Sequence, residues 1–448
     1  MAMRPRGLVW AMVIVMLAAS TSGCWDREEL DEVGIVGAIG LDKGGDGQVI
    51  VSLEVVNPKA LASAQTMGGD SAPVVAVVLR DQADTISSAI RNAQRRLPRT
   101  LTMGQVSSII VGQSLAREGI GQYLDFVLRD ARIRNSAVLA TCDTGSGLLQ
   151  RPLIEPIPSR VLLALSNTAL AGGKTVRTTI NEFTVKLAEP GIEPVTLHTA
   201  GRKTKDIQVK RQGEEVKQTD KAVMLEQPIE ANVDIEGELP PDSPVLNPLK
   251  EAASGESVPG MTIDVGVAAY KGDKLVGLLD GAEARGYLWL SGDLREASVE
   301  VPDPFGSGKM VGLDVVRANS SIKPIFEGGP EGIKMHAEIH VDLEAAQFQL
   351  ATDLRKTGII DALEQSLDAL VTREIRATLE RVQKEFKSDI YGFGYEVYKS
   401  NPDLWATMEH TWNDEVFPNV EVELDVVTRV RAPGAIYGLL PHGLLPRK

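Results

Sequence analysis

Residues 1–24 have the pattern of a bacterial export signal, and this pattern decides the compartment in which the rest of the chain must fold. Arg4 and Arg6 give a positively charged start, an apolar run of 12 residues extends from Leu8 to Ala19, and the segment ends at Cys24. A mature transmembrane helix needs roughly 18 to 20 apolar residues, so this run is too short to span a bilayer. We therefore interpret residues 1–23 as a cleaved signal peptide and expect the mature chain outside the cytoplasm.

Cys24 is the candidate lipidation site. Ser22 and Gly23 directly before it resemble a lipobox, at which the thiol receives a diacylglyceryl group and the cysteine becomes the mature N-terminus. Lipoboxes usually have Leu three residues before the cysteine, and here that position is Thr21, so ordinary signal cleavage that leaves a free Cys24 is the alternative. Acyl chains contribute about 0.8 kcal/mol per buried methylene, and two such chains anchor a protein stably.

Composition indicates a protein of two to four domains, with only two cysteines. The chain has 448 residues, 43% of them apolar, which is enough for several cores. Its formal net charge of −14 disfavours nucleic acid and anionic lipid head groups as partners. Cys142 is the only cysteine besides Cys24 and lies in a strand-like run, so we expect a small buried thiol and no disulfide framework.

Hydrophobic periodicity predicts an α+β fold class, with mixed α and β segments throughout. In the first part, apolar runs at 33–41 and 48–56 predict a hairpin, and residues 114–129 have the spacing of one helix. Prolines and charges then dominate residues 202–259, which marks a boundary. We predict three mixed domains after the signal peptide: 24–202 as an N-terminal α+β domain, 260–303 as a small β-rich middle domain, and 304–448 as a C-terminal α+β domain. Residues 203–259 are predicted to be a linker or insertion between the first two.

The second half has its own pattern of strands and one long helix. Short strands are expected at 262–270, 274–279 and 285–290, and alternation predicts antiparallel strands at 312–325 and 333–343, with a last strand at 420–430. Residues 357–388 form an amphipathic helix with one apolar stripe. A coiled coil would have a similar stripe, but this repeat drifts over barely four heptads.

Aromatic residues are concentrated between Phe386 and Phe417, a segment that includes Trp405 and Trp412. We expect these two tryptophans to be buried against the long helix. The alternative is a surface patch that contacts a partner.

The residues that usually carry chemistry are sparse. His336 and His340 form the only close histidine pair, and the alternation around them is that of a strand. Their side chains would then be roughly 13 Å apart at about 3.3 Å per residue, too far to share one metal ion. A nucleophile elbow of the form Gly-x-Ser-x-Gly is also missing from the sequence. We therefore expect neither catalytic residues nor a cofactor or metal, with scattered carboxylates as the alternative that motifs do not detect.

Several segments, spread in order over nearly the whole mature chain, carry a shared set of motifs. They are 23–30, 34–42, 109–112, 115–120, 128–130, 269–277, 285–289, 389–394, 401–405, Trp412 and 417–418. Together these segments resemble the C-subunit family of bacterial spore germinant receptors, the Ger(x)C lipoproteins. The chain departs from the family at Thr21, at Gln105 where members often have His, and in the long insertion.

This resemblance implies a three-domain α and β protein without catalytic residues. It implies a subunit held by lipid at Cys24 on the outer face of the spore's inner membrane, with the polytopic A and B receptor subunits as partners. The B subunit of such receptors is the expected germinant binder, so a C subunit would support assembly or signalling. The alternative function is a lipid-anchored solute-binding protein of a transporter, although such proteins usually have two α/β lobes around a cleft.

Limited proteolysis tests the predicted boundary. We expect the first cleavages between residues 202 and 259, because prolines and charges leave little apolar surface to offset the entropy of ordering that segment. Mass spectrometry of the early fragments locates the cuts. Resistance of this segment under conditions that cut other loops would show that it is packed.

Overall fold

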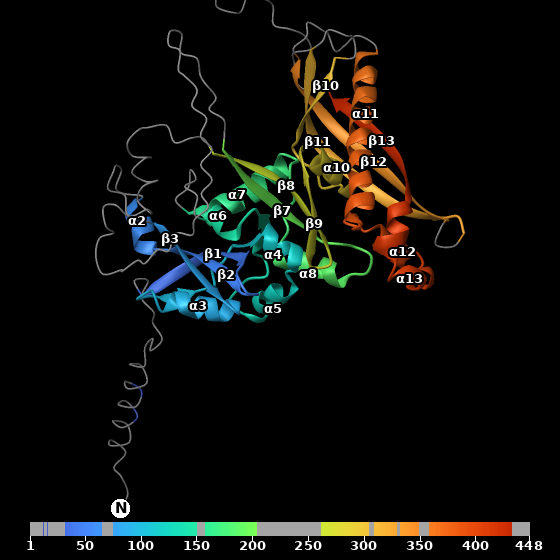
Figure 1. Ribbon diagram of the computed structural model, residues 1–448. Coiled ribbons are helices and arrows are strands. Elements are labelled where there is room, and N and C mark those ends of the chain that lie inside the picture. Colours follow the sequence, from blue (N-terminus) through green and yellow to red (C-terminus); the bar gives the residue numbers. More distant parts are fainter. Residues whose placement is uncertain are drawn as a thin grey trace, which may run out of the picture.

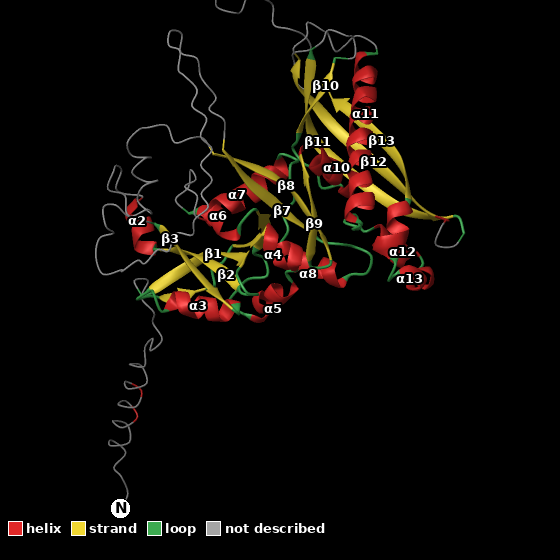
Figure 2. Cartoon of the chain, viewed as in Figure 1, coloured by secondary structure: helices red, strands yellow, loops and turns green. Residues whose placement is uncertain are grey.

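The computed structural model describes residues 32–64, 75–149, 157–203, 261–303, 309–328, 332–348 and 358–431, with residues 12 and 16. These residues form two β-sheets, each packed against helices (Figure 1), and the mixed distribution of helix and strand (Figure 2) confirms the predicted α+β class. Cys24 and almost all of the predicted insertion lie outside the described residues.

The first sheet has nine strands in the order β3-β2-β1-β5-β6-β7-β8-β9, with β4 also paired to β1. Neighbours are parallel from β1 to β7, and β2, β3, β8 and β9 pair antiparallel with theirs. The predicted hairpin is confirmed as β1 and β2. The strands are β1 (Val33–Lys43), β2 (Val49–Val56), β3 (Ala76–Ala83), β4 (Thr100–Thr102), β5 (Ser108–Gly112), β6 (Val138–Cys142), β7 (Val195–Lys203), β8 (Met261–Lys271) and β9 (Lys274–Asp280).

Helices cover both faces of this sheet. Strands β5 and β6 are buried at every residue, as expected for parallel strands between two layers of helices. Side chains of α3, α4, α5 and α8 enter one core, and those of α6 and α7 enter a smaller core on the opposite face. The helices are α2 (Pro58–Ala64), α3 (Ile86–Gln94), α4 (Gln113–Glu118), α5 (Gly121–Arg129), α6 (Gly145–Leu149), α7 (Pro158–Ala171) and α8 (Ile180–Ala188).

The prediction of one helix over 114–129 is wrong, because α4 and α5 are separated at Gly119, which has φ +125°. The turn between β8 and β9 contacts this break. The Ile120 N–H donates to the backbone carbonyl of Asp273, and the Gly121 N–H donates to the Asp273 carboxylate, both over 2.9 Å. The spacing of apolar residues over 114–129 does not predict this break, because Asp273, which contacts it, lies some 150 residues away in the sequence.

The second sheet has the order β10-β11-β12-β13, in which β12 and β13 are parallel and the other pairs antiparallel. The predicted antiparallel pair is confirmed as β11 and β12. Buried residues alternate with more exposed ones over Val311–Val315 of β11 and Ile333–Leu343 of β12. One face packs on helices in the largest core of the described chain. The strands are β10 (Ser298–Pro302), β11 (Met310–Phe326), β12 (Ile333–Phe348) and β13 (Glu421–Arg431).

Residues 260–303 contribute to both sheets. Strands β8 and β9 extend the first sheet through the pairing of β7 with β8, whereas β10 belongs to the second sheet. The predicted strand at 285–290 is wrong, because these residues lie in helix α10 (Gly281–Ser291). Its apolar run is buried on all sides, and a short run of that kind has no periodicity that separates strand from helix. Where the domain boundaries fall stays a prediction.

Helix α11 (Ile359–Glu380) lies within the predicted long helix and continues as a π-helical turn, η2 (Arg381–Phe386). Its apolar stripe packs into the core of the second sheet, as in a globular domain rather than a coiled coil. The chain ends with α12 (Phe393–Ser400), α13 (Pro402–Met408), η3 (Trp412–Val416), η4 (Phe417–Asn419) and β13.

Helices α10 and α11 approach closely at Gly286, where a Cβ atom would lie 2.3 Å from the carbonyl oxygen of Glu374. The buried Glu374 carboxylate accepts hydrogen bonds from the Arg285 guanidinium and from Trp289 Nε1. This contact explains the local sequence Arg-Gly-Tyr-Leu-Trp: the glycine allows the approach, and its neighbours satisfy the buried charge.

Candidate functional site

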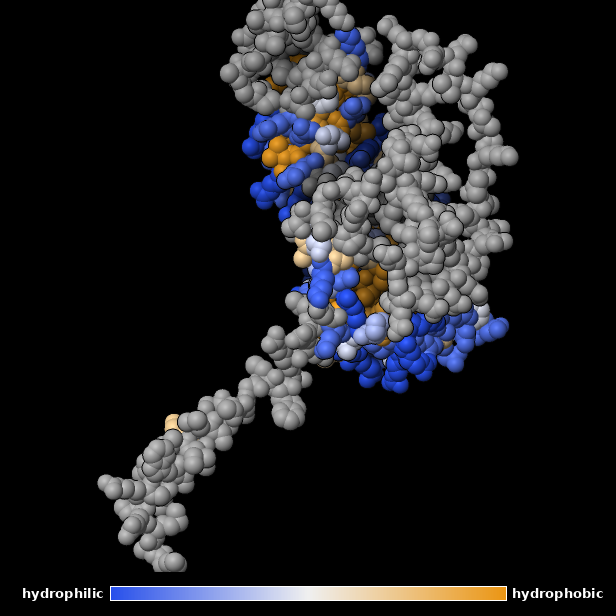
Figure 3. All heavy atoms as spheres, turned by 90° about the vertical axis from the view of Figure 1, so that its left-hand side faces the viewer, coloured by the Kyte–Doolittle hydropathy of each residue, from blue (hydrophilic) through white to orange (hydrophobic). Residues whose placement is uncertain are grey.

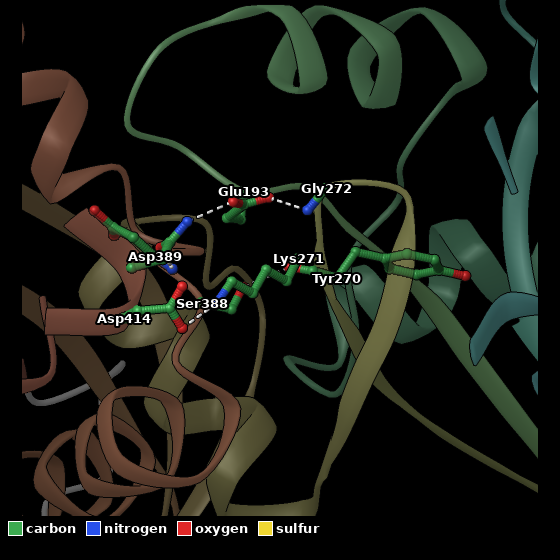
Figure 4. A network of polar contacts seen from close by, with 8 residues as sticks. Glu193, Tyr270, Lys271, Gly272, Ser388, Asp389 and Asp414 are labelled. Atoms are coloured by element: carbon green, nitrogen blue, oxygen red, sulfur yellow. Dashed lines mark hydrogen bonds and ion pairs between the residues drawn. The ribbon is translucent and has the colours of Figure 1, made fainter. Parts of the chain in front are cut away.

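The two sheets are joined by a polar junction, which we define as residues 191–194, 270–272, 388–395 and 412–414 (Figure 4). We call each sheet together with its helices a unit. The first two segments belong to the strands and turns of the first unit. In the second unit, residues 388–395 lead into α12 and residues 412–414 follow α13. The junction therefore brings together segments about 80 and 200 residues apart.

Asp389 is the centre of the junction. Its side chain is fully buried and accepts four hydrogen bonds. The backbone N–H groups of Gly392, Phe393 and Gly394 donate over 2.9, 3.1 and 2.7 Å, and Trp412 Nε1 donates over 2.8 Å. Burial raises the pKa of Asp389 to about 6, although these donors act in the opposite direction. The carboxylate thus fixes both the turn before α12 and the position of Trp412.

Glycines allow the two units to meet backbone to backbone. Gly191 has φ +70°, and a Cβ there would lie 2.4 Å from the carbonyl carbon of Gly394. Tyr395 donates its N–H to the Gly191 carbonyl over 2.9 Å. Gly392 has φ +76°, a left-handed conformation that favours glycine. Larger residues at Gly191 or Gly394 would separate the segments.

Glu193, Asp389 and Asn413 form a closed ring of hydrogen bonds across the junction. Glu193 N–H donates to the Asp389 carbonyl over 2.9 Å, and Asp389 N–H donates to Asn413 Oδ1 over 3.0 Å. Asn413 Nδ2 then donates to Glu193 Oε1 over 2.6 Å, while Gly272 N–H donates to the other carboxylate oxygen (Figure 4). Burial raises the pKa of Glu193, and these donors oppose that rise.

Two further contacts join the same segments. Lys271 forms an ion pair with Asp414 at 2.6 Å, and the buried Ser388 hydroxyl donates to the Tyr270 carbonyl. Tyr270 is itself fully buried, and its hydroxyl contacts Thr141 Oγ1 at 2.7 Å inside the first sheet. These contacts tie residues 388–414 to the first sheet. The buried carboxylates of Asp389 and Glu193 are engaged by N–H donors.

The structure places several residues that the sequence singled out. Trp405 and Trp412 are 3% and 1% exposed and share a core with α11, which confirms their predicted burial. Cys142 is buried in β6, as expected. His336 and His340 lie four residues apart on the same face of β12, opposite Glu423 and Val427 of β13.

Sequence reasoning missed the junction itself. Asp389 followed by glycines at the third and fifth positions is a local signal of a turn capped by a side chain. The position of Glu193 between Pro190 and Pro194 gives no comparable signal, because its partners are far away in the sequence. In the described part of the chain, no helix is both long and apolar enough to cross a bilayer.

Comparisons with known proteins cover both units. Residues 26–198 match the family described as spore germination protein N-terminal domain, and residues 265–434 match the family described as spore germination B3/GerAC like, C-terminal. Together the two matches span more than half of the chain.

Individual relatives align end to end. Spore germination protein KC of Bacillus subtilis (strain 168) is 24% identical over 447 residues, which cover 98% of each chain. Spore germination protein YndF of the same organism is 23% identical and covers 95% of this chain and 97% of its own. A structure described as the crystal structure of the GerBC protein aligns with a TM-score of 0.46 and 14% identity, covering 90% of this chain and 99% of that chain.

Trp412→Ala should lower the free energy of unfolding by about 3 to 5 kcal/mol, because it empties a large buried volume. Trp412→Phe retains most of the ring and mainly loses the bond to Asp389, so about 1 to 3 kcal/mol is expected. Urea denaturation of the purified protein measures both. An unchanged stability of Trp412→Ala together with lost receptor assembly would show that the aromatic cluster is a partner surface.

Asp389→Asn should destabilise the protein by roughly 1 to 3 kcal/mol. Each carboxylate oxygen of Asp389 accepts two N–H groups. An amide has only one acceptor oxygen, so in either orientation its NH₂ group would face two N–H donors and leave them without an acceptor. Thermal unfolding followed by tryptophan fluorescence reports the change. Asp403→Asn, at an exposed position in the first turn of α13, is the matched control. It should cost less than about 1 kcal/mol, because it removes only a favourable charge near the helix N-terminus. Equal effects of the two substitutions would contradict the role of Asp389.

Proposed function

Because the chain belongs to the Ger(x)C family of spore germination proteins, we propose that it is a subunit of a nutrient germinant receptor. In this proposal the subunit is non-catalytic and anchored by lipid at Cys24. It sits on the outer face of the spore's inner membrane and supports receptor assembly or signalling together with polytopic A and B subunits.

The observation that carries the proposal is the position of the two family segments in the fold. The N-terminal match ends within β7 and the C-terminal match begins within β8. These two strands pair directly, with His198 opposite Gly266. Both family segments are therefore present in this chain and are joined through one sheet.

The junction supports a mechanical role. Its buried carboxylates accept hydrogen bonds from backbone and side-chain N–H groups, which hold the turn segments in fixed positions. Such a link suits a subunit that positions its partners or passes a displacement between them. A catalytic carboxylate would instead be expected in a cleft, beside a second group that exchanges a proton.

The alternative of a transporter's solute-binding protein gains no support from the fold. Such proteins usually have two α/β lobes around a cleft. The two units here differ in kind: the first is a mixed sheet covered on both faces, and the second is a four-stranded sheet covered on one face.

Cys24→Ala tests the anchor and the receptor role together. The substitution should leave the described units folded, because Cys24 precedes β1 and its lipid would lie outside both cores. It should release the protein from membranes or leave it unprocessed, and spores should respond poorly to the receptor's germinant because the subunit is no longer concentrated beside its partners.

Three measurements decide this prediction: membrane fractionation, mass spectrometry of the mature N-terminus and a germination assay. A mutant that stays in the membrane with a cleaved signal and germinates normally would refute the lipid anchor. A mutant that is released yet germinates normally would show that protein contacts alone hold the subunit.

A further inference from the structure

A cluster of arginines interrupts the acidic composition of the chain around α3. Residues 76–102 contain five arginines and only two acidic residues, in a chain whose net charge is −14. Arg91, Arg95, Arg96 and Arg99 lie at the C-terminal end of α3 and in the segment that leads to β4. We refer to these four residues as the arginine patch.

The arginine patch is largely unneutralised. Arg91, Arg95 and Arg96 are exposed and Arg99 is half-buried. Arg96 pairs with Asp81, whereas Arg95 donates to the neutral Asn92 side chain and Arg99 to that of Asn57. Among the described residues no carboxylate forms an ion pair with Arg91, Arg95 or Arg99, so their charge is available to a partner.

The fold places the patch beside the point where the chain enters the first sheet. Strand β4 pairs with the first residues of β1, with Thr100 opposite Val33, and Thr100 N–H donates to the Glu32 carbonyl over 2.7 Å. The Cβ of Arg99 lies 3.9 Å from the position that a Cβ on Gly34 would occupy. Helix α3 runs along the lower edge of the first unit in Figure 1, and hydrophilic residues cover the lower end of that unit in Figure 3.

The length of the tether limits how far this edge can be from a bilayer. Val33 follows Cys24 by nine positions, which span at most about 30 Å when fully extended at 3.3 to 3.6 Å per residue. An acylated Cys24 would therefore hold the start of β1, and the arginine patch beside it, within about 30 Å of the membrane surface. Shorter separations are favoured entropically, because an extended tether is one conformation among many.

We propose that the arginine patch is a second membrane contact, a docking surface for the phosphate groups of anionic phospholipids. The proposal rests on the proposed anchor, which supplies the proximity, while the patch would set the orientation of the first unit on the bilayer. The acidic net charge does not oppose this contact, since charges farther than the Debye length of about 8 Å are largely screened. Each arginine near an anionic surface strengthens binding by about fivefold.

The competing explanation is that these arginines only stabilise α3. Cations in the last turn of a helix interact favourably with its dipole, and Arg91 and Arg95 lie there. That role predicts an effect on stability and no difference between neutral and anionic membranes. Binding to vesicles therefore separates the two explanations.

The experiment uses the full mature chain with Cys24→Ala, which carries no lipid, so the patch is measured without the anchor. Co-sedimentation is compared for vesicles of phosphatidylcholine alone and of phosphatidylcholine with an equal part of phosphatidylglycerol. The test variant is Arg91→Gln with Arg95→Gln. The matched control is Arg373→Gln with Arg376→Gln, which makes the same change in net charge at exposed positions on α11.

We expect binding to the anionic vesicles only, weakened about 25-fold in the test variant at fivefold per arginine and unchanged in the control. Salt should weaken the binding of the parent chain. Absence of binding to anionic vesicles, or an equal loss in test and control variants, would overturn the proposal. Thermal unfolding of the test variant confirms that it is folded.

The lipid-anchor hypothesis and the docking-surface hypothesis are tested by separate measurements. Mass spectrometry of the wild-type N-terminus reads acylation of Cys24 independently of the vesicle assay. An unacylated Cys24 with vesicle binding retained would refute the anchor and leave the docking surface standing. An acylated Cys24 with no vesicle binding by the unlipidated chain would do the reverse.

Discussion

The buried carboxylate of Asp389 is the interaction on which the relation between the two sheets depends. A carboxylate removed from water is costly unless its lone pairs are satisfied, and here three backbone N–H groups and one indole N–H satisfy them. Because the donors come from one turn and from Trp412, the same charge orders the turn and seats the aromatic core. The turn then presents its backbone to Gly191 and Glu193 of the first unit.

The path of the chain brings the same residues into contact with both units. The turn between β8 and β9 contacts both the break between α4 and α5 and the ring formed by Glu193 and Asn413. Helix α10 then crosses α11 at Gly286, where Glu374 receives its buried hydrogen bonds. Residues that follow the segment between the two family matches therefore contact both units. The largest core likewise contains residues of both sheets.

The distribution of charge complements this arrangement. The chain is acidic overall, yet the edge next to the start of β1 carries the arginine patch. The outward positions of β13 are mixed in charge, with Glu421, Glu423 and Asp425 followed by two arginines. A subunit tethered at its N-terminus would hold the cationic edge near a membrane. The net charge of the whole chain does not determine whether this edge binds an anionic surface, because salt screens the charges that lie farther away than the Debye length.

The sequence alone determined the features that depend on neighbouring residues. The hairpin of β1 and β2, the alternation along β11 and β12 and the apolar stripe of α11 all follow from local periodicity, and the family resemblance follows from ordered motifs. The export signal ending at Cys24 stays a prediction from the sequence. Only the tertiary structure decided that residues 285–290 are helical, that Gly119 divides a helix, and that Asp389 and Glu193 meet. Each of these involves contacts with residues far away in the sequence, such as Glu374, Asp273 and Asn413. A hydrogen bond or close backbone approach of that kind leaves no period in either segment.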